Sequence, residues 1–159
     1  MVVDTTPFMG VMFGPPGITA EGVRPMADQM RAQVLADPSG SSRNLIEQMI
    51  PAMTRTETMR SVLLQYHATA TVRQSPIAFH EGLVTDLRFE LPRITAPMTV
   101  LYVIPPNAPI PPEQFESAVR LSFTNAPGAR LVRIEDSAHF IQIDQPARVA
   151  AEVEAFMRK

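Results

Sequence analysis

The sequence predicts an α/β fold, in which parallel strands form a sheet with helices packed on its faces. Residues 98–104 form a continuous apolar run, which is typical of a strand buried on both faces. A helical segment, a second strand at 130–134 and a final amphipathic helix then follow in alternation, and this order indicates a parallel sheet with helical crossovers. Residues 19–85 instead carry apolar side chains at helical spacing, so we expect a group of helices ahead of the main strand.

The composition is that of a globular protein and argues against several functional classes. Of the 159 residues, 45% are hydrophobic and 19% are charged, and the formal net charge is -2 with no basic stripe, so we expect no nucleic-acid partner. The absence of cysteine excludes a disulfide framework, a thiolate metal site and a cysteine nucleophile. The first residues lack the basic region of a signal peptide, and no apolar run reaches the roughly 20 residues of a membrane helix. We therefore expect a cytoplasmic protein that makes no use of a membrane.

The N-terminal half is predicted to be mostly helical. Val2 and Val3 look like the end of a strand, as though the chain began in the middle of a fold, and residues 8–22 look like a loop rich in glycine and proline. Helices are expected from residue 19 or 21 to about 36, from 41 or 42 to 53, from 56 onward, and from 75 to about 85. These helices are short and rich in methionine. They either pack simply on one another or form a lid that faces a substrate.

The C-terminal half is predicted to alternate between strands and helices. A connector at 87–97 leads into the apolar strand, and a proline-rich loop at 105–112 follows it. We expect a helix at 113–125, a strand at 130–134 and a loop at 135–145 that contains His139. Pro146 then begins the final helix, because proline suits the first turn.

This order of features resembles the end of the α/β-hydrolase fold. The features are the strand after Leu91-Pro-Arg-Ile-Thr-Ala-Pro97, the segment Asp136-Ser-Ala-His-Phe140 after the second strand, and Asp144-Gln-Pro146 before the terminal helix. In that family a histidine lies in the loop after the last strand, and a helix that begins with proline follows. The resemblance implies a partial α/β-hydrolase fold, with residues 1–7 and 88–159 in the core and residues 8–87 in a helical cap.

The same resemblance implies catalytic roles for particular residues. His139 would be the general base, because it follows the last strand at the edge of the sheet where ligands bind. The usual position of the acid holds Asn107 and no carboxylate. Some members supply the acid one strand earlier, where Asp4 stands, and Asp4 could alternatively only initiate a turn. Weaker candidates for the acid are Asp86, Glu135 and Asp136.

No nucleophile is found in this sequence. The family requires Gly-x-Ser-x-Gly at a strand-to-helix turn, and the sequence contains no such motif. We therefore expect the nucleophile from a missing N-terminal half, whether a separate chain, a cleaved segment or a part absent from this sequence. Together they would hydrolyse a small apolar ester or a related carboxylic substrate without any cofactor. The alternative is a non-catalytic truncated relative that acts in binding or association.

Apolar side chains are the candidates for substrate binding. We expect Phe8, Met26, Met30 and Phe140 to line an acyl pocket, although core packing explains the methionines equally well. His67 and His80 have no partners at the spacing of metal ligands, so they are expected on the surface or lining the cap, and no metal site is predicted.

An exposed sheet edge is the feature that predicts a partner chain. The strand at residues 1–4 or the strand at 98–104 would pair with the N-terminal half or with a second copy of the chain, because a long apolar edge favours association. The competing outcome is a compact monomer in which residues 8–40 cover that edge of the sheet.

Overall fold

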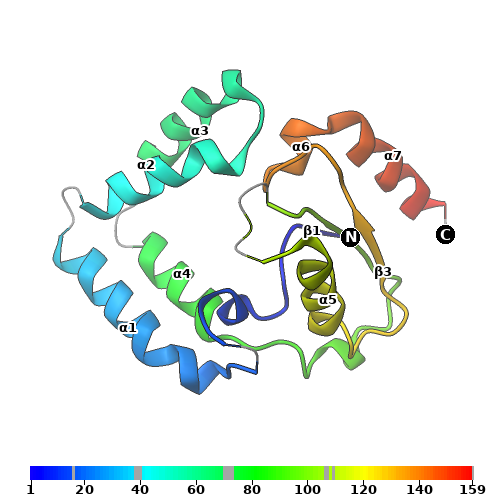
Figure 1. The fold of residues 1–159 in the computed structure, drawn as a ribbon, viewed down its shortest axis with the longest axis horizontal. Coiled ribbons are helices and arrows are strands. Elements are labelled where there is room, and N and C mark those ends of the chain that lie inside the picture. Colours follow the sequence, from blue (N-terminus) through cyan, green and yellow to red (C-terminus); the bar gives the residue numbers. More distant parts are fainter. Residues whose placement is uncertain (16, 38–40, 70–73, 106–107, 109, 159) are drawn as a thin grey trace.

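The protein forms a small parallel sheet beside a group of helices (Figure 1). The structure is a computed structural model and describes residues 1–15, 17–37, 41–69, 74–105, 108 and 110–158. The strands are β1 (Val2–Val3), β2 (Thr99–Tyr102) and β3 (Arg130–Arg133), and they lie in the order β1-β2-β3. Val2 pairs with Val100, and Leu101 pairs with Val132, in parallel register throughout. The predicted α/β class is confirmed.

The central position of β2 corrects one expectation about the edges of the sheet. β2 is flanked by β1 on one side and β3 on the other, so residues 98–104 do not form an exposed edge. β1 is an outer strand, and its Val3 is 40% exposed. The long apolar run therefore reflects burial at the middle of the sheet and within both of its faces.

Helices cover the two faces of the sheet. Because side chains alternate along a strand, Val100 faces one side and Leu101 the other, and both are fully buried. Val100 packs with Phe123, at the end of α5 (Pro112–Ser122). Leu101 packs with Ile141 of the short α6 (Ile141–Asp144), in a cluster that Val149 of α7 (Pro146–Met157) also contacts. The sheet therefore lies between α5 on one face and α6 with α7 on the other.

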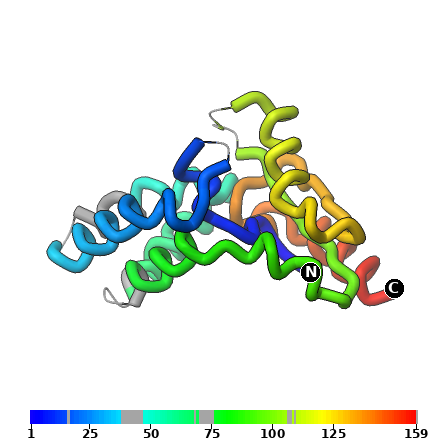
Figure 2. Tube along the Cα trace, turned by 90° about the horizontal axis from the view of Figure 1, so that it is seen from below, coloured from blue at the N-terminus to red at the C-terminus, as the bar shows by residue number. Residues whose placement is uncertain are grey.

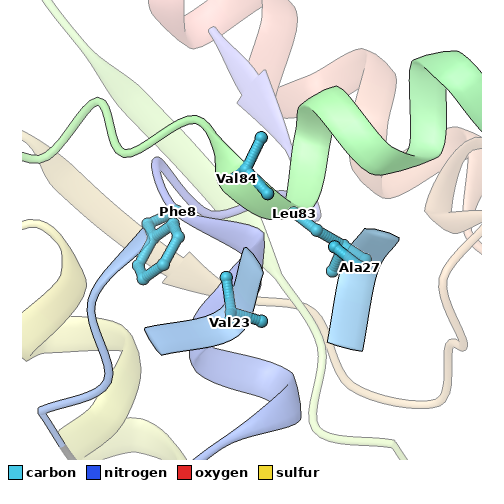
Figure 3. Close-up of a cluster of buried hydrophobic side chains, with 5 residues drawn as sticks. All are labelled: Phe8, Val23, Ala27, Leu83 and Val84. Carbon is cyan, nitrogen blue, oxygen red and sulfur yellow. The ribbon is translucent and has the colours of Figure 1, made fainter. Parts of the chain in front are cut away.

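The remaining helices form two pairs, α1 (Ala20–Ala36) with α4 (Gln74–Val84) and α2 (Ser41–Met53) with α3 (Glu57–Thr69), and the first pair has a core of its own. Both views show them together on one side of the sheet (Figures 1 and 2). Thr19 caps α1, since its hydroxyl accepts a hydrogen bond from the Gly22 amide at 3.1 Å. Figure 3 shows the buried side chains where α1 and α4 meet, which are Phe8, Val23, Ala27, Leu83 and Val84.

The two ends of this helical segment, residues 8–87, lie side by side. The amide of Leu87 donates a hydrogen bond to the Pro7 carbonyl oxygen at 2.8 Å. The guanidinium of Arg88 lies over the Phe8 ring, 4.8 Å from its centroid. The segment thus leaves the sheet and returns to it at one place, as an insertion would.

Short helices occur in segments that were expected to be loops. A 3₁₀ helix, η1 (Met9–Phe13), follows Phe8, and a second one, η2 (Leu91–Arg93), lies in the connector. In the loop after β3, α6 forms because fully buried Ile141 anchors that turn to the core. None of the helices in the described part of the chain has both the length and the apolar character needed to cross a membrane.

Candidate active site

His139 and Asp4 meet at the carboxyl edge of the sheet. Asp4 directly follows β1, and His139 lies in the loop after β3. Because the strands are parallel, their carboxyl ends meet at one edge, where open α/β sheets bind ligands. The distance between His139 Nδ1 and Asp4 Oδ2 is 2.9 Å, although the two residues are 135 positions apart.

The backbone of β2 holds Asp4 in place. The Asp4 amide donates to the Leu101 carbonyl oxygen at 2.8 Å, and Asp4 Oδ1 accepts from the Val103 amide at 3.0 Å. Asp4 has a φ of 42°, in the left-handed region that aspartate tolerates better than most residues. One carboxylate oxygen is therefore fixed by the sheet, and the other is directed at the imidazole.

The imidazole of His139 keeps one nitrogen available for chemistry. Since the Asp4 carboxylate can only accept, Nδ1 carries the proton of their hydrogen bond, and Nε2 retains a lone pair that can accept another proton. The side chain is 47% exposed, so the ring is not enclosed by packed side chains. The Phe140 ring lies against it, with centroids 5.2 Å apart.

Asp144 connects the loop of His139 to the helical segment. Its carboxylate accepts from the Ala138 amide, one residue before His139, at 2.8 Å. It also accepts from the Thr54 hydroxyl at 2.7 Å and from the amides of Arg55 and Thr56 at 3.0 Å. Burial alone would raise the pKa of Asp144, but these hydrogen bonds outweigh burial and lower the pKa to about 2. The carboxylate is therefore ionised at neutral pH and orders both loops.

Comparison with solved structures identifies the architecture. An enol-lactonase from Burkholderia xenovorans LB400 matches with a TM-score of 0.56 and 18% identity, over 82% of this chain and 50% of that one. A thermophilic esterase from Thermogutta terrifontis, solved with malate bound, matches with a TM-score of 0.61 and 22% identity, over 91% of this chain and 51% of that one. The chain has part of the α/β-hydrolase fold. It spans about half the length of these two structures. Neither a protein-family model nor a curated protein matches the sequence.

Within this α/β-hydrolase fold, the residues expected to bind substrate lie in two places. Phe140 lies beside His139. Phe8 is 0% exposed in the core of the helical segment, and Met26 and Met30 pack against that core from α1. These three side chains pack in or against the core, which was the alternative interpretation of the methionines. Their part in substrate binding stays a prediction.

The other candidates for the acid are bound elsewhere. Asp86, Glu135 and Asp136 each face an arginine, respectively Arg88, Arg133 and Arg55. The hydrogen bond from Arg88 lowers the pKa of Asp86. Asn107 lies outside the described residues. Asp4 is thus the carboxylate that this part of the α/β-hydrolase fold brings to His139.

Two groups in the α/β-hydrolase fold were not anticipated from the sequence. His80 was expected on the surface or lining the cap, but it is 4% exposed, and its Nε2 lies 2.8 Å from Asp28 Oδ1. This contact joins α4 to α1. Asp144 was expected only as part of the segment that leads into the terminal helix. In the described residues, no three histidine or acidic side chains gather as metal ligands would.

Proposed function

We propose that this chain supplies the histidine and the acid of a serine-type hydrolase that cleaves a carboxylic ester. The observation that carries the proposal is the 2.9 Å contact between His139 Nδ1 and Asp4 Oδ2 at the carboxyl edge of a partial α/β-hydrolase sheet. The two similar structures are named as a lactonase and an esterase, and both names denote cleavage of a carboxylic ester bond.

The chemistry assigns a separate task to each residue. His139 Nε2 takes the proton of a serine hydroxyl as its oxygen attacks the carbonyl carbon, and then gives that proton to the departing alcohol. In the second half of the cycle, Nε2 takes a proton from water as the water oxygen attacks the acyl carbon. Nε2 then gives that proton to the serine oxygen as its bond to the acyl carbon breaks, which releases the acid and regenerates serine. Asp4 keeps the ring oriented and stabilises the imidazolium that forms in each step.

The nucleophile and the oxyanion hole are proposed to come from polypeptide outside residues 1–159. These residues contain no Gly-x-Ser-x-Gly motif. They also span about half the length of the similar hydrolases. β1 is an outer strand, so a further parallel strand can pair with it and place a serine near Asp4 and His139. The helical segment, residues 8–87, would then act as the cap over a small apolar substrate.

Labelling and hydrolysis test this proposal together. Material purified from its natural host is weighed by intact mass, treated with a fluorophosphonate that labels activated serines, and assayed with short-chain p-nitrophenyl esters. We expect a labelled serine outside residues 1–159. His139→Ala should lower kcat by roughly 10²–10⁴-fold, and Asp4→Asn should also lower kcat. His67→Ala, on α3, serves as the matched histidine control. Hydrolysis that is undiminished in His139→Ala would remove the catalytic assignment.

The alternative function is binding or association without catalysis, and the lack of a nucleophile in these residues favours it. It predicts a single polypeptide by intact mass, no labelled serine and no turnover of any ester.

A further inference from the structure

A cavity of about 290 Å³ lies between the helical segment and the loop that carries His139. The residues that line it include Pro51, Thr54, Arg55, Arg60, Pro105 and Ala138. Pro105 follows β2 and Ala138 follows β3, so the cavity is at the same edge of the sheet as the candidate active site. Its size suits a small ligand or one end of a larger one.

The cavity has a basic wall with an unused donor. Arg60, near the start of α3, has a buried Nε that makes no hydrogen bond within the described part of the chain. The Arg60 side chain as a whole is 36% exposed, so parts of it other than Nε remain accessible from the cavity that it lines. Arg55 adds a second guanidinium to the same wall.

The acidic neighbours of these arginines leave their donors available. Arg60 Nη1 lies 3.6 Å from Glu57 Oε1, and Arg55 Nη1 lies 3.7 Å from Asp136 Oδ1. Both distances exceed that of a hydrogen bond, and both carboxylates are more than 80% exposed, so these ion pairs are weak and easily exchanged. Asp144, behind the wall, accepts from backbone amides and threonine hydroxyls and from neither guanidinium.

We propose that this cavity binds a carboxylate of the substrate and that Arg60 is the main residue selecting it. A planar carboxylate matches the paired N–H donors of a guanidinium. Resting on the proposed function, the inference narrows the substrate to an ester or lactone that carries a free carboxylate.

The cavity borders the loop that carries His139. Ala138 lines the cavity and directly precedes His139, and consecutive Cα atoms are about 3.8 Å apart. A monoester of a short dicarboxylic acid carries both a free carboxylate and an ester carbonyl and is the substrate chosen for the test. A neutral ester of equal length would lack the contact with Arg60.

Binding of an inert analogue tests the inference without any turnover. The natural material is titrated by calorimetry with 5-oxohexanoate, a keto acid that cannot be hydrolysed, and with 2-heptanone, its neutral counterpart. We expect the keto acid to bind more tightly than the ketone. Arg60→Gln should lower the affinity for the keto acid about tenfold or more and leave the affinity for the ketone unchanged. Arg24→Gln, an exposed arginine on α1, is the matched control and should bind as the wild type does.

Two further measurements keep the outcomes distinct. Arg60→Lys retains the charge but not the paired donors of a guanidinium, so its affinity for the keto acid should fall between those of wild type and Arg60→Gln. If Arg60→Gln fails to fold, Arg60→Lys is the variant that tests the inference. Turnover of monomethyl glutarate should exceed that of dimethyl glutarate in kcat/KM, and Arg60→Gln should remove the preference. If turnover depends on His139 but shows no preference for the anion, this inference fails and the proposed function stands. If the keto acid binds through Arg60 without any turnover, the proposed function fails and the anion site stands. Equal binding of the keto acid to wild type and Arg60→Gln overturns the inference.

Discussion

Replacing Asp144 by asparagine should loosen the connection between the loop of His139 and the helical segment. The substitution keeps the shape of the side chain but removes the charge and exchanges one acceptor oxygen for a donor. At neutral pH, the lowering of this pKa from 3.8 to about 2 corresponds to roughly 2 kcal/mol of folding stability. The Ala138 amide, which donates to Oδ2, also loses its acceptor when that oxygen is replaced, and this raises the expected loss to about 2–4 kcal/mol.

Urea unfolding at pH 7, followed by circular dichroism, measures that loss. Glu154→Gln is the matched control, because Glu154 is exposed and forms only a surface pair with Arg158, and it should change stability by less than about 0.5 kcal/mol. Amide hydrogen exchange should accelerate at Ala138 and Thr56 in Asp144→Asn and not in the control. If Asp144→Asn unfolds at the wild-type urea concentration and keeps wild-type protection at both amides, Asp144 does not join the two loops as described.

Three further predictions concern stability. Gly10→Ala should lower folding stability by about 1–3 kcal/mol, because the added Cβ would lie 2.8 Å from the Leu83 carbonyl oxygen. Thermal melting checks this against the control Gly128→Ala, whose added Cβ meets nothing within 4 Å. Phe8→Ala should cost about 3–5 kcal/mol by urea unfolding, since the buried ring would leave a cavity; a loss below about 1 kcal/mol would contradict its place in the core. The contribution of Asp144 to folding stability should be complete above about pH 4 and should disappear as the pH falls through about 2, because this carboxylate binds a proton more readily in the unfolded chain than in the folded one. A urea series across that range should show a shallower pH dependence for Asp144→Asn than for wild type.

The helices and strands could largely be predicted from local sequence, for identifiable reasons. The apolar run at 98–104 marked β2, because a central strand buries both faces. Pro146 marked the start of α7, and Thr19 was one of the two candidates, with Glu21, for the start of α1, because capping and the first turn depend on neighbouring residues alone. The short 3₁₀ turn at Met9–Phe13 was missed, since Gly10 and the following prolines indicated a loop.

The sequence by itself determined the α/β class and made His139 the candidate base, through the order of the segments around it. It left the acid undecided between Asp4 and several others, and it said nothing of Asp144 as a connector. Only the tertiary structure placed Asp4 Oδ2 against His139 Nδ1, and Asp144 against the turn at Thr54. The physical reason is that helix and strand patterns arise from residues a few positions apart. Contacts across 135 or 90 positions depend instead on how β1 registers with β2 and on where the helical segment returns to the sheet.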